Sequence, residues 1–248
     1  MAAATVARVI ENRYWSSPRD RTVSGSLGLC HMSVFEPPFN VDARNYPPQD
    51  PVRSRAFAES LDTVEQVLDE LGPRCVLTPL PSAVRADLDV VHVAAWGSMV
   101  GIADPVFAAA SGGPLKAVAA QLRERYPAAR IVGRVTYYSP AEDTEDTEDL
   151  VWLPDGAMFH AAGRSGVEPF AVIGDPDAVI ASLGLAGWML DNAGVDLAEK
   201  ASEVEWARLA GLALGHSDPW GWEQMETTAL RVRHSEAAVR SMEHRYFG

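Results

Sequence analysis

The residues best suited to chemistry lie in one short turn and on one predicted strand. The turn contains His216, Asp218, Trp220 and Trp222. A histidine can act as a general base when a carboxylate orients its ring, and indole rings form the walls of ligand clefts and partner contacts. With His160, the turn would suit a hydrolase-like site. The alternative is a loop that its two indoles anchor to the core.

Histidine and cysteine could also combine into a metal site. Cys30, His31 and His92 would meet His160 if their strands adjoined, and thiolates with imidazoles bind zinc. The spacings typical of zinc ligands, CxxC and HxxxH, do not occur in the sequence. Cys30 and His31 are also neighbours on a predicted strand, where adjacent side chains point to opposite faces. We therefore predict neither a metal site nor a cofactor.

His160 is positioned by the clearest hairpin signal in the chain. Asp155-Gly156 lies between two apolar runs and is typical of a two-residue β-turn. Such a turn predicts three cross-strand pairs: Leu153 with Met158, Trp152 with Phe159, and Val151 with His160. Paired residues share a face of the sheet. His160 would therefore lie among apolar side chains, where a half-buried structural histidine is the alternative to a catalytic one.

The segment 142–149 contains six acidic residues and no basic residue. Like charges at this density repel one another and resist burial, so we predict a solvated surface loop. The segment lacks the glycine and the ligand spacing of a calcium-binding loop. Two functions remain open for it, a solvated linker or a contact for a basic protein partner.

Apolar periodicity and turn residues predict the other elements. Helices are expected over 51–71, 114–126, 176–183, 188–192, 203–214 and 235–246. Strands are expected over 26–35, 75–80, 90–96, 99–102, 131–138, 150–153, 157–161, 170–173 and 228–233. Helices and strands mix without a strict βαβ repeat. This favours an α+β (mixed α/β) fold with a mostly antiparallel or mixed sheet, flanking amphipathic helices and a helical C-terminal third.

We expect a flexible N-terminal arm over 1–24 and one α+β domain over 25–248, with a helical subdomain from about 174 as the alternative. The helices over 175–196 resemble a helix-turn-helix in outline. A recognition helix needs cationic and polar side chains for phosphates and base edges. No lysine or arginine lies between 175 and 199, so these helices are expected to pack rather than to bind DNA.

Charge and composition exclude several classes of protein. The chain has 21 basic and 34 acidic residues, a net charge of −13. This surplus repels nucleic-acid phosphates and anionic lipids. No apolar run is long enough to cross a bilayer, and the N-terminus does not read as a secretory signal. We expect a soluble cytoplasmic protein that binds neither nucleic acid nor membranes, with Cys30 and Cys75 reduced.

Five stretches resemble an uncharacterised family of acidic cytoplasmic proteins from actinobacteria, a domain of unknown function. They are Arg55–Ser60, Arg85–Asp89, Thr147–Pro154, Met158–Gly163 and Ser217–Trp220. The resemblance spans roughly residues 26 to 245. No activity is established for that family, so the resemblance implies no catalytic residues.

Two hypotheses about function follow. The first is a non-enzymatic binding or interaction protein that uses its acidic surface and the region of Trp220 and Trp222, with a basic protein as a partner. The second is a small-molecule enzyme whose cleft gathers His160, His216 and Asp218. Direct cooperation needs His160 and Asp218 in one pocket, and a separation beyond about 10 Å would exclude it.

Overall fold

The computed structural model describes residues 13–109, 113–140 and 142–248. Within these residues the chain forms a sheet of nine strands in the order β2-β9-β3-β4-β1-β5-β6-β7-β8, and all neighbouring strands are antiparallel. The strands are β1 (Ser26–Phe35), β2 (Val64–Cys75), β3 (Val90–Trp96), β4 (Met99–Ala103), β5 (Arg130–Ser139), β6 (Thr144–Trp152), β7 (Met158–Arg164), β8 (Ala171–Gly174) and β9 (Glu226–His234). The helices are α1 (Pro51–Glu59), α2 (Pro114–Arg125), α3 (Pro176–Leu183), α4 (Gly187–Ala193), α5 (Trp206–Leu214) and α6 (Glu236–Phe247).

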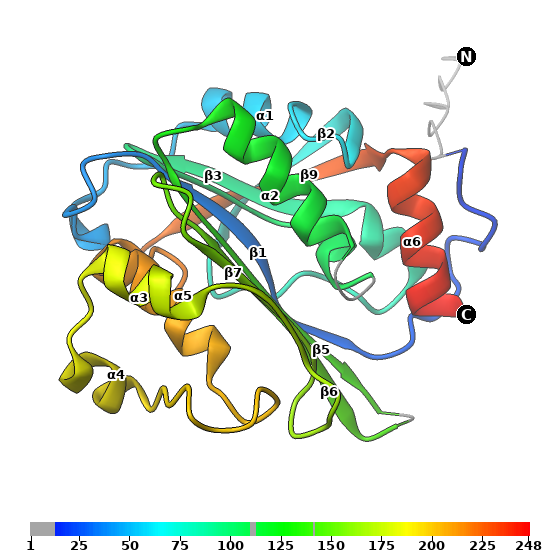
Figure 1. Cartoon of the computed structure of the whole chain (residues 1–248). Coiled ribbons are helices and arrows are strands. Elements are labelled where there is room, and N and C mark those ends of the chain that lie inside the picture. The colour runs from blue at the N-terminus through cyan, green and yellow to red at the C-terminus, as the bar shows by residue number, and fades with distance from the viewer. Residues whose placement is uncertain (1–12, 110–112, 141) are drawn as a thin grey trace, which may run out of the picture.

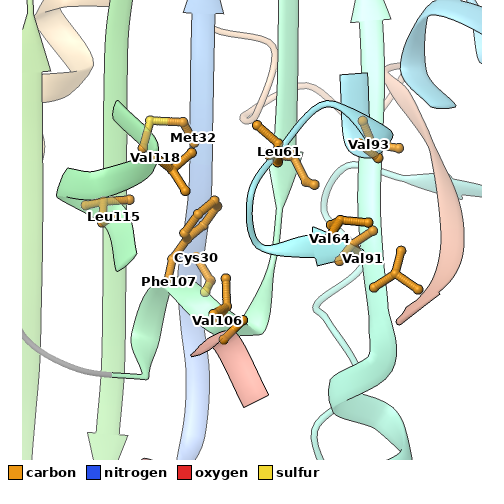
Figure 2. Close-up of a cluster of buried hydrophobic side chains, with 14 of the residues drawn as sticks. Cys30, Met32, Leu61, Val64, Val91, Val93, Val106, Phe107, Leu115 and Val118 are labelled. Atoms are coloured by element: carbon orange, nitrogen blue, oxygen red, sulfur yellow. The ribbon is translucent and has the colours of Figure 1, made fainter. Parts of the chain in front are cut away.

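Helices cover both faces of this sheet, so the molecule has three layers. α1, α2 and α6 lie on one face, and α3, α4 and α5 lie on the other (Figure 1). The first face buries an apolar cluster that includes Met32, Val93 and Leu115 (Figure 2). The second face buries a cluster that includes Phe159 and Leu209. The mixed α/β fold and the antiparallel sheet are confirmed, but β9 returns to the sheet and interrupts the expected helical C-terminal third.

Several elements begin and end where local signals place them. The Asp175 carboxylate accepts a hydrogen bond from the Ala178 N–H at the start of α3, and Asp50 caps α1 in the same way. Gly184 ends α3 with a φ of 66°, which glycine adopts without strain. α5 begins at Trp206 rather than at the expected 203. Side-chain caps therefore mark the starts of α1 and α3, whereas the other four helices described begin without a side-chain cap hydrogen bond.

The helix expected over 51–71 is wrong beyond Glu59. β2 begins at Val64 and pairs with β9 at the edge of the sheet, and the strand expected over 75–80 is limited to Cys75. Three register shifts in β2 insert extra residues, so that residues on one face recur every third position rather than every second. Val64 and Val67 are buried at that spacing. A three-residue apolar spacing resembles a helical stripe, which explains the error.

The acidic segment predicted as a solvated loop is mostly part of β6, which lies between β5 and β7. Its carboxylates alternate between the two faces. Asp146 pairs with Arg245 of α6, and Glu148 hydrogen bonds to His160 of β7, while Asp149 faces the other side. Glu148 and Asp149 are each 3% exposed. Partners on neighbouring elements compensate Asp146 and Glu148, and such pairing permits the burial of charged groups.

The hairpin forms, but its pairing differs from the prediction by one residue. The observed pairs are Trp152 with Met158, Val151 with Phe159, and Leu150 with His160. The Gly156 N–H donates to the Leu153 carbonyl, so Pro154 and Asp155 occupy the centre of the turn. Gly156 follows with a φ of 97°. Pro154 has no N–H to close a two-residue turn at 155–156, which moves the turn back by one residue.

Residues 13–24, from the region expected to form a flexible arm, contact the C-terminal helix and the short 3-10 turn Arg85–Asp89 that precedes β3. The Trp15 indole N–H donates to Asp89 at 2.9 Å. The Glu243 carboxylate of α6 accepts hydrogen bonds from the backbone N–H groups of Ser16 and Ser17. The rest of the predicted arm, residues 1–12, lies outside the described residues.

Candidate functional site

His160 lies inside the molecule, on the sheet face that α2 and α6 cover. It pairs with Leu150 of β6, which belongs to the apolar cluster of that face. The His160 Nε2 lies 2.8 Å from Oε1 of Glu148. The two side chains are 3% and 4% exposed. This buried pair joins β6 to β7 and offers no surface to a substrate.

Asp218 and His216 lie on the opposite face of the sheet. Oδ2 of Asp218 is 3.7 Å from Nη1 of Arg134 on β5, and burial raises the pKa of Asp218. His216 is exposed. Arg134 and His160 pair with residues 149 and 150, which are consecutive in β6 and therefore face opposite sides. The sheet separates His160 from Asp218, so the predicted site of His160, His216 and Asp218 is not assembled.

Trp220 packs against the sheet rather than presenting a free contact surface. Its indole stacks on the His31 imidazole, with ring centroids 4.6 Å apart and planes 7° apart. Its Nε1 donates a hydrogen bond to the Ser33 hydroxyl at 2.8 Å, and Trp96 meets it edge to face. The prediction that indoles anchor this turn therefore describes Trp220 well.

Gly101 of β4 provides the room for this indole. A Cβ at Gly101 would lie 2.7 Å from Cζ2 of Trp220. Because the indole is held by its stacking partner and its hydrogen bond, Gly101→Ala is expected to lower the free energy of unfolding by about 1–3 kcal/mol. Gly211→Ala is the matched control, because there the nearest atom is Nη1 of Arg134 at 3.8 Å, an ordinary van der Waals distance. Urea unfolding should show the larger loss at Gly101, and equal losses would contradict this account.

Trp222 is half-buried and borders a hollow of about 650 Å³ that Tyr46, Pro47 and Trp96 also line. The Arg44 guanidinium lies over the Trp222 ring, 5.2 Å from its centroid. Trp222 thus borders a hollow, as a binding residue would. A cation of the same chain already occupies one side of its ring.

The sheet face beneath the 216–222 turn carries a row of polar residues, in which the sequence had suggested the two histidines as candidates but neither Arg134 nor Asp149. His92, His31, Arg134 and Asp149 lie in register across β3, β1, β5 and β6, with Ala103 of β4 between the histidines. Burial lowers the pKa of His31 to about 3 and of His92 to about 4, and raises the pKa of Asp149 to about 7. Both imidazoles are therefore neutral near pH 7. Only strand register brings these residues together, so no local signal in the sequence could identify the row.

A separate hollow of about 610 Å³ lies over α3, α4 and the segment that follows α4; we refer to it as the acidic groove. Among the described residues that line it, none is basic and four are acidic: Asp177, Asp191, Asp196 and Glu199. The apolar residues that line it are Ile180, Leu190, Val195 and Leu197. α4 lies at the margin of the molecule (Figure 1). None of its residues is buried, and Trp188 is 65% exposed.

The remaining findings concern the chain rather than a single site. In the part that the structure describes, no helix has the length and apolar character needed to cross a membrane, and no three histidine, cysteine, aspartate or glutamate side chains are grouped to hold a metal ion. A family model described as a family of unknown function (DUF6333) matches residues 14–248. No curated protein and no solved structure matches the chain.

Proposed function

The chain belongs to the DUF6333 family, a family of unknown function, and we propose that it is a non-enzymatic binding protein whose acidic groove receives a basic segment of a partner protein. One observation carries the proposal. Four carboxylates and four apolar side chains line one hollow, without a basic residue among its described lining residues. Basic partners complement such a surface in charge.

The partner segment is expected to be both cationic and amphipathic. Its lysine or arginine side chains would pair with the four carboxylates, and its apolar side chains would cover Leu190, Leu197 and the exposed ring of Trp188. Exposed tryptophans are frequent hot spots of binding. The net charge of −13 would add long-range attraction and speed association with a cationic partner.

The acidic groove, rather than the tryptophans of the 216–222 turn, carries this proposal. Trp220 is packed on His31, and Trp222 already contacts Arg44. A cytoplasmic location belongs to the same proposal. Cys30 and Cys75 are both free thiols, which fits a reducing compartment.

The test uses a synthetic amphipathic peptide of lysine and leucine as the probe. Its affinity, measured by fluorescence anisotropy, is compared between the wild type and the double variant Asp191→Lys/Asp196→Lys. The variant removes two attractions and adds two repulsions, which should weaken binding by about tenfold or more. Added salt should also weaken binding to the wild type, because these charges lie at the surface.

The matched control is Glu70→Lys/Glu124→Lys, which changes the net charge equally at exposed positions on β2 and α2. This variant should retain most of the wild-type affinity. Equal weakening in both variants would mean that total charge, not the acidic groove, attracts the peptide. Undiminished binding to the groove variant would also contradict the proposal, as would binding of a glutamate–leucine peptide of the same pattern.

A further inference from the structure

A third hollow, of about 440 Å³, lies between β5–β6 and the segment 202–207. Its volume falls within the range of about 300–1,000 Å³ that is typical of small-molecule sites. The carboxylates that line it are Glu145, Asp149, Glu203 and Glu205. Two threonines and two serines add hydroxyl groups, Phe170 and Trp206 add aromatic rings, and no described lining residue is basic. We refer to it as the Asp149 hollow.

One wall of the Asp149 hollow is held by hydrogen bonds. The Trp206 indole N–H donates to the Ala201 carbonyl at 2.7 Å. The Ser202 N–H donates to Glu168 at 3.2 Å, and the Ser202 carbonyl accepts from the Gly166 N–H at 2.8 Å. A ligand would therefore meet a wall that is already ordered, which lowers the entropic cost of binding.

Asp149 is the residue of this lining that most needs a partner. The residue is 3% exposed, and its Oδ1 has no hydrogen-bond partner among the described residues. Arg134 lies opposite Asp149 in register and attracts its carboxylate, but no hydrogen bond joins the Asp149 Oδ1 to it, and its Nη1 is 3.7 Å from Asp218. A buried carboxylate without a full set of partners is unfavourable, and a cation that enters the hollow would supply the missing donor.

We propose that the Asp149 hollow binds a small organic cation that carries a primary ammonium or a guanidinium group, with Asp149 as the acceptor of its charged head. The hydroxyl groups would accept the remaining N–H groups, and Phe170 and Trp206 would contact the carbon chain. The oxygen atoms of this lining are spread over several side chains, and no three metal-ligating side chains are grouped in the described residues. An organic head group with several N–H donors therefore suits the lining better than a metal ion. This inference is independent of the acidic groove.

Cation binding is expected to depend on pH. Burial raises the pKa of Asp149 to about 7. The charged groups around it are Arg134, which lowers this pKa, Glu148 and Glu205, which raise it, and Glu145 and Glu203, which line the same hollow. The carboxylate predominates at pH 8 and the protonated form at pH 6, so affinity for a cation should be about tenfold higher at pH 8.

The test is isothermal titration calorimetry with n-butylamine and n-butylguanidine as cationic probes and n-butanol as the neutral one. Both cations should bind to the wild type more tightly at the higher pH, and butanol should not bind. Asp149→Asn should weaken cation binding by at least about tenfold, the loss expected when a charge-assisted hydrogen bond is removed. The groove variant Asp191→Lys/Asp196→Lys should bind both cations as the wild type does.

A second variant guards against a loss of folding. Thr147→Val removes one lining hydroxyl without changing charge, and it should weaken cation binding about threefold to tenfold. Undetectable binding of both cations to the wild type would overturn the proposal. So would equal binding of butanol, or wild-type affinity in a folded Asp149→Asn variant. A negative result here leaves the peptide experiment on the acidic groove unaffected, because different variants and probes are measured.

Discussion

The Asp149→Asn variant is expected to gain stability relative to the wild type as the pH rises from about 4 to about 8. The ordinary pKa of 3.8 applies to Asp149 in the unfolded chain, and burial raises the pKa to about 7 in the folded chain. Between these values the folded state keeps a proton that the unfolded state has released. The free energy of unfolding of the wild type therefore falls with rising pH, and this contribution is complete below the lower pKa and lost above the higher one. The advantage of the variant should grow by about 1.4 kcal/mol per pH unit within this window.

Urea unfolding of both proteins at about pH 4, 6 and 8 measures this difference. The pKa values of His31 and His92 are lowered in the folded chain. Their contribution to the free energy of unfolding therefore increases as the pH rises, whereas that of Asp149 decreases. Both proteins share the contribution of the histidines, and it cancels when one curve is subtracted from the other. Asp191→Asn, at an exposed position, is the control and should show no such trend. A constant difference between Asp149→Asn and the wild type would show that Asp149 titrates at its ordinary pKa.

Glu148→Ala is expected to destabilise the protein by about 3 kcal/mol, the usual cost of removing one partner of a buried pair. His160 would lose the acceptor that lies 2.8 Å from its Nε2, and its Nδ1 already has no hydrogen-bond partner among the described residues. The side chain removed is 4% exposed, so a cavity adds to the loss. Thermal and urea unfolding at neutral pH measure the effect.

Glu145→Ala is the matched control for Glu148→Ala, because Glu145 lies on the same strand but is exposed. Its effect should stay within about 0.5 kcal/mol, as is usual at surface positions. A double variant that adds His160→Phe should lose less than the two single changes together, since each change removes the same interaction. Additive losses, or equal losses for Glu145→Ala and Glu148→Ala, would contradict the pairing.

Local signals predicted much of the fold because most elements are bounded by residues with strong backbone preferences. Asp175 and Gly184 define α3 through a side-chain cap and a left-handed glycine. Burial is continuous along the second half of β1, all of β3 and most of β4, as is typical of central strands covered on both faces. The prediction of an antiparallel sheet with flanking helices rests on such elements.

The errors arise where neighbouring strands decide the structure. The bulges of β2 are visible only in its pairing with β9, and without that partner Val64 and Val67 resemble a helical stripe. The run of acidic residues in β6 indicates a loop when the segment is considered alone. In the folded chain, basic residues of other elements lie beside it, as Arg245 of α6 lies beside Asp146. Tertiary context overrides local preference at both strands.

The candidate sites were predictable to different degrees. The acidic groove follows from a composition that the sequence already displays, the lack of lysine and arginine between 175 and 199. The Asp149 hollow and the row that includes His31 and Arg134 depend on strand register, and a shift of one residue moves every side chain to the other face. His160 illustrates this, because the predicted pairing with Val151 would place it on the opposite face of the sheet from the observed pairing with Leu150.

The bulged edge strand makes strand-to-strand pairing with a second copy unfavourable. A regular outer strand offers an unbroken line of N–H and C=O groups to a strand of a second copy. β2 bulges at three places along its length. The bulges twist the strand, so its backbone N–H groups cannot all align with the carbonyl groups of a straight partner strand. At the far edge β8 has only four residues, too few to template a long ladder. The nine-stranded sheet is thus terminated on both sides, and growth into fibrils by strand addition is disfavoured.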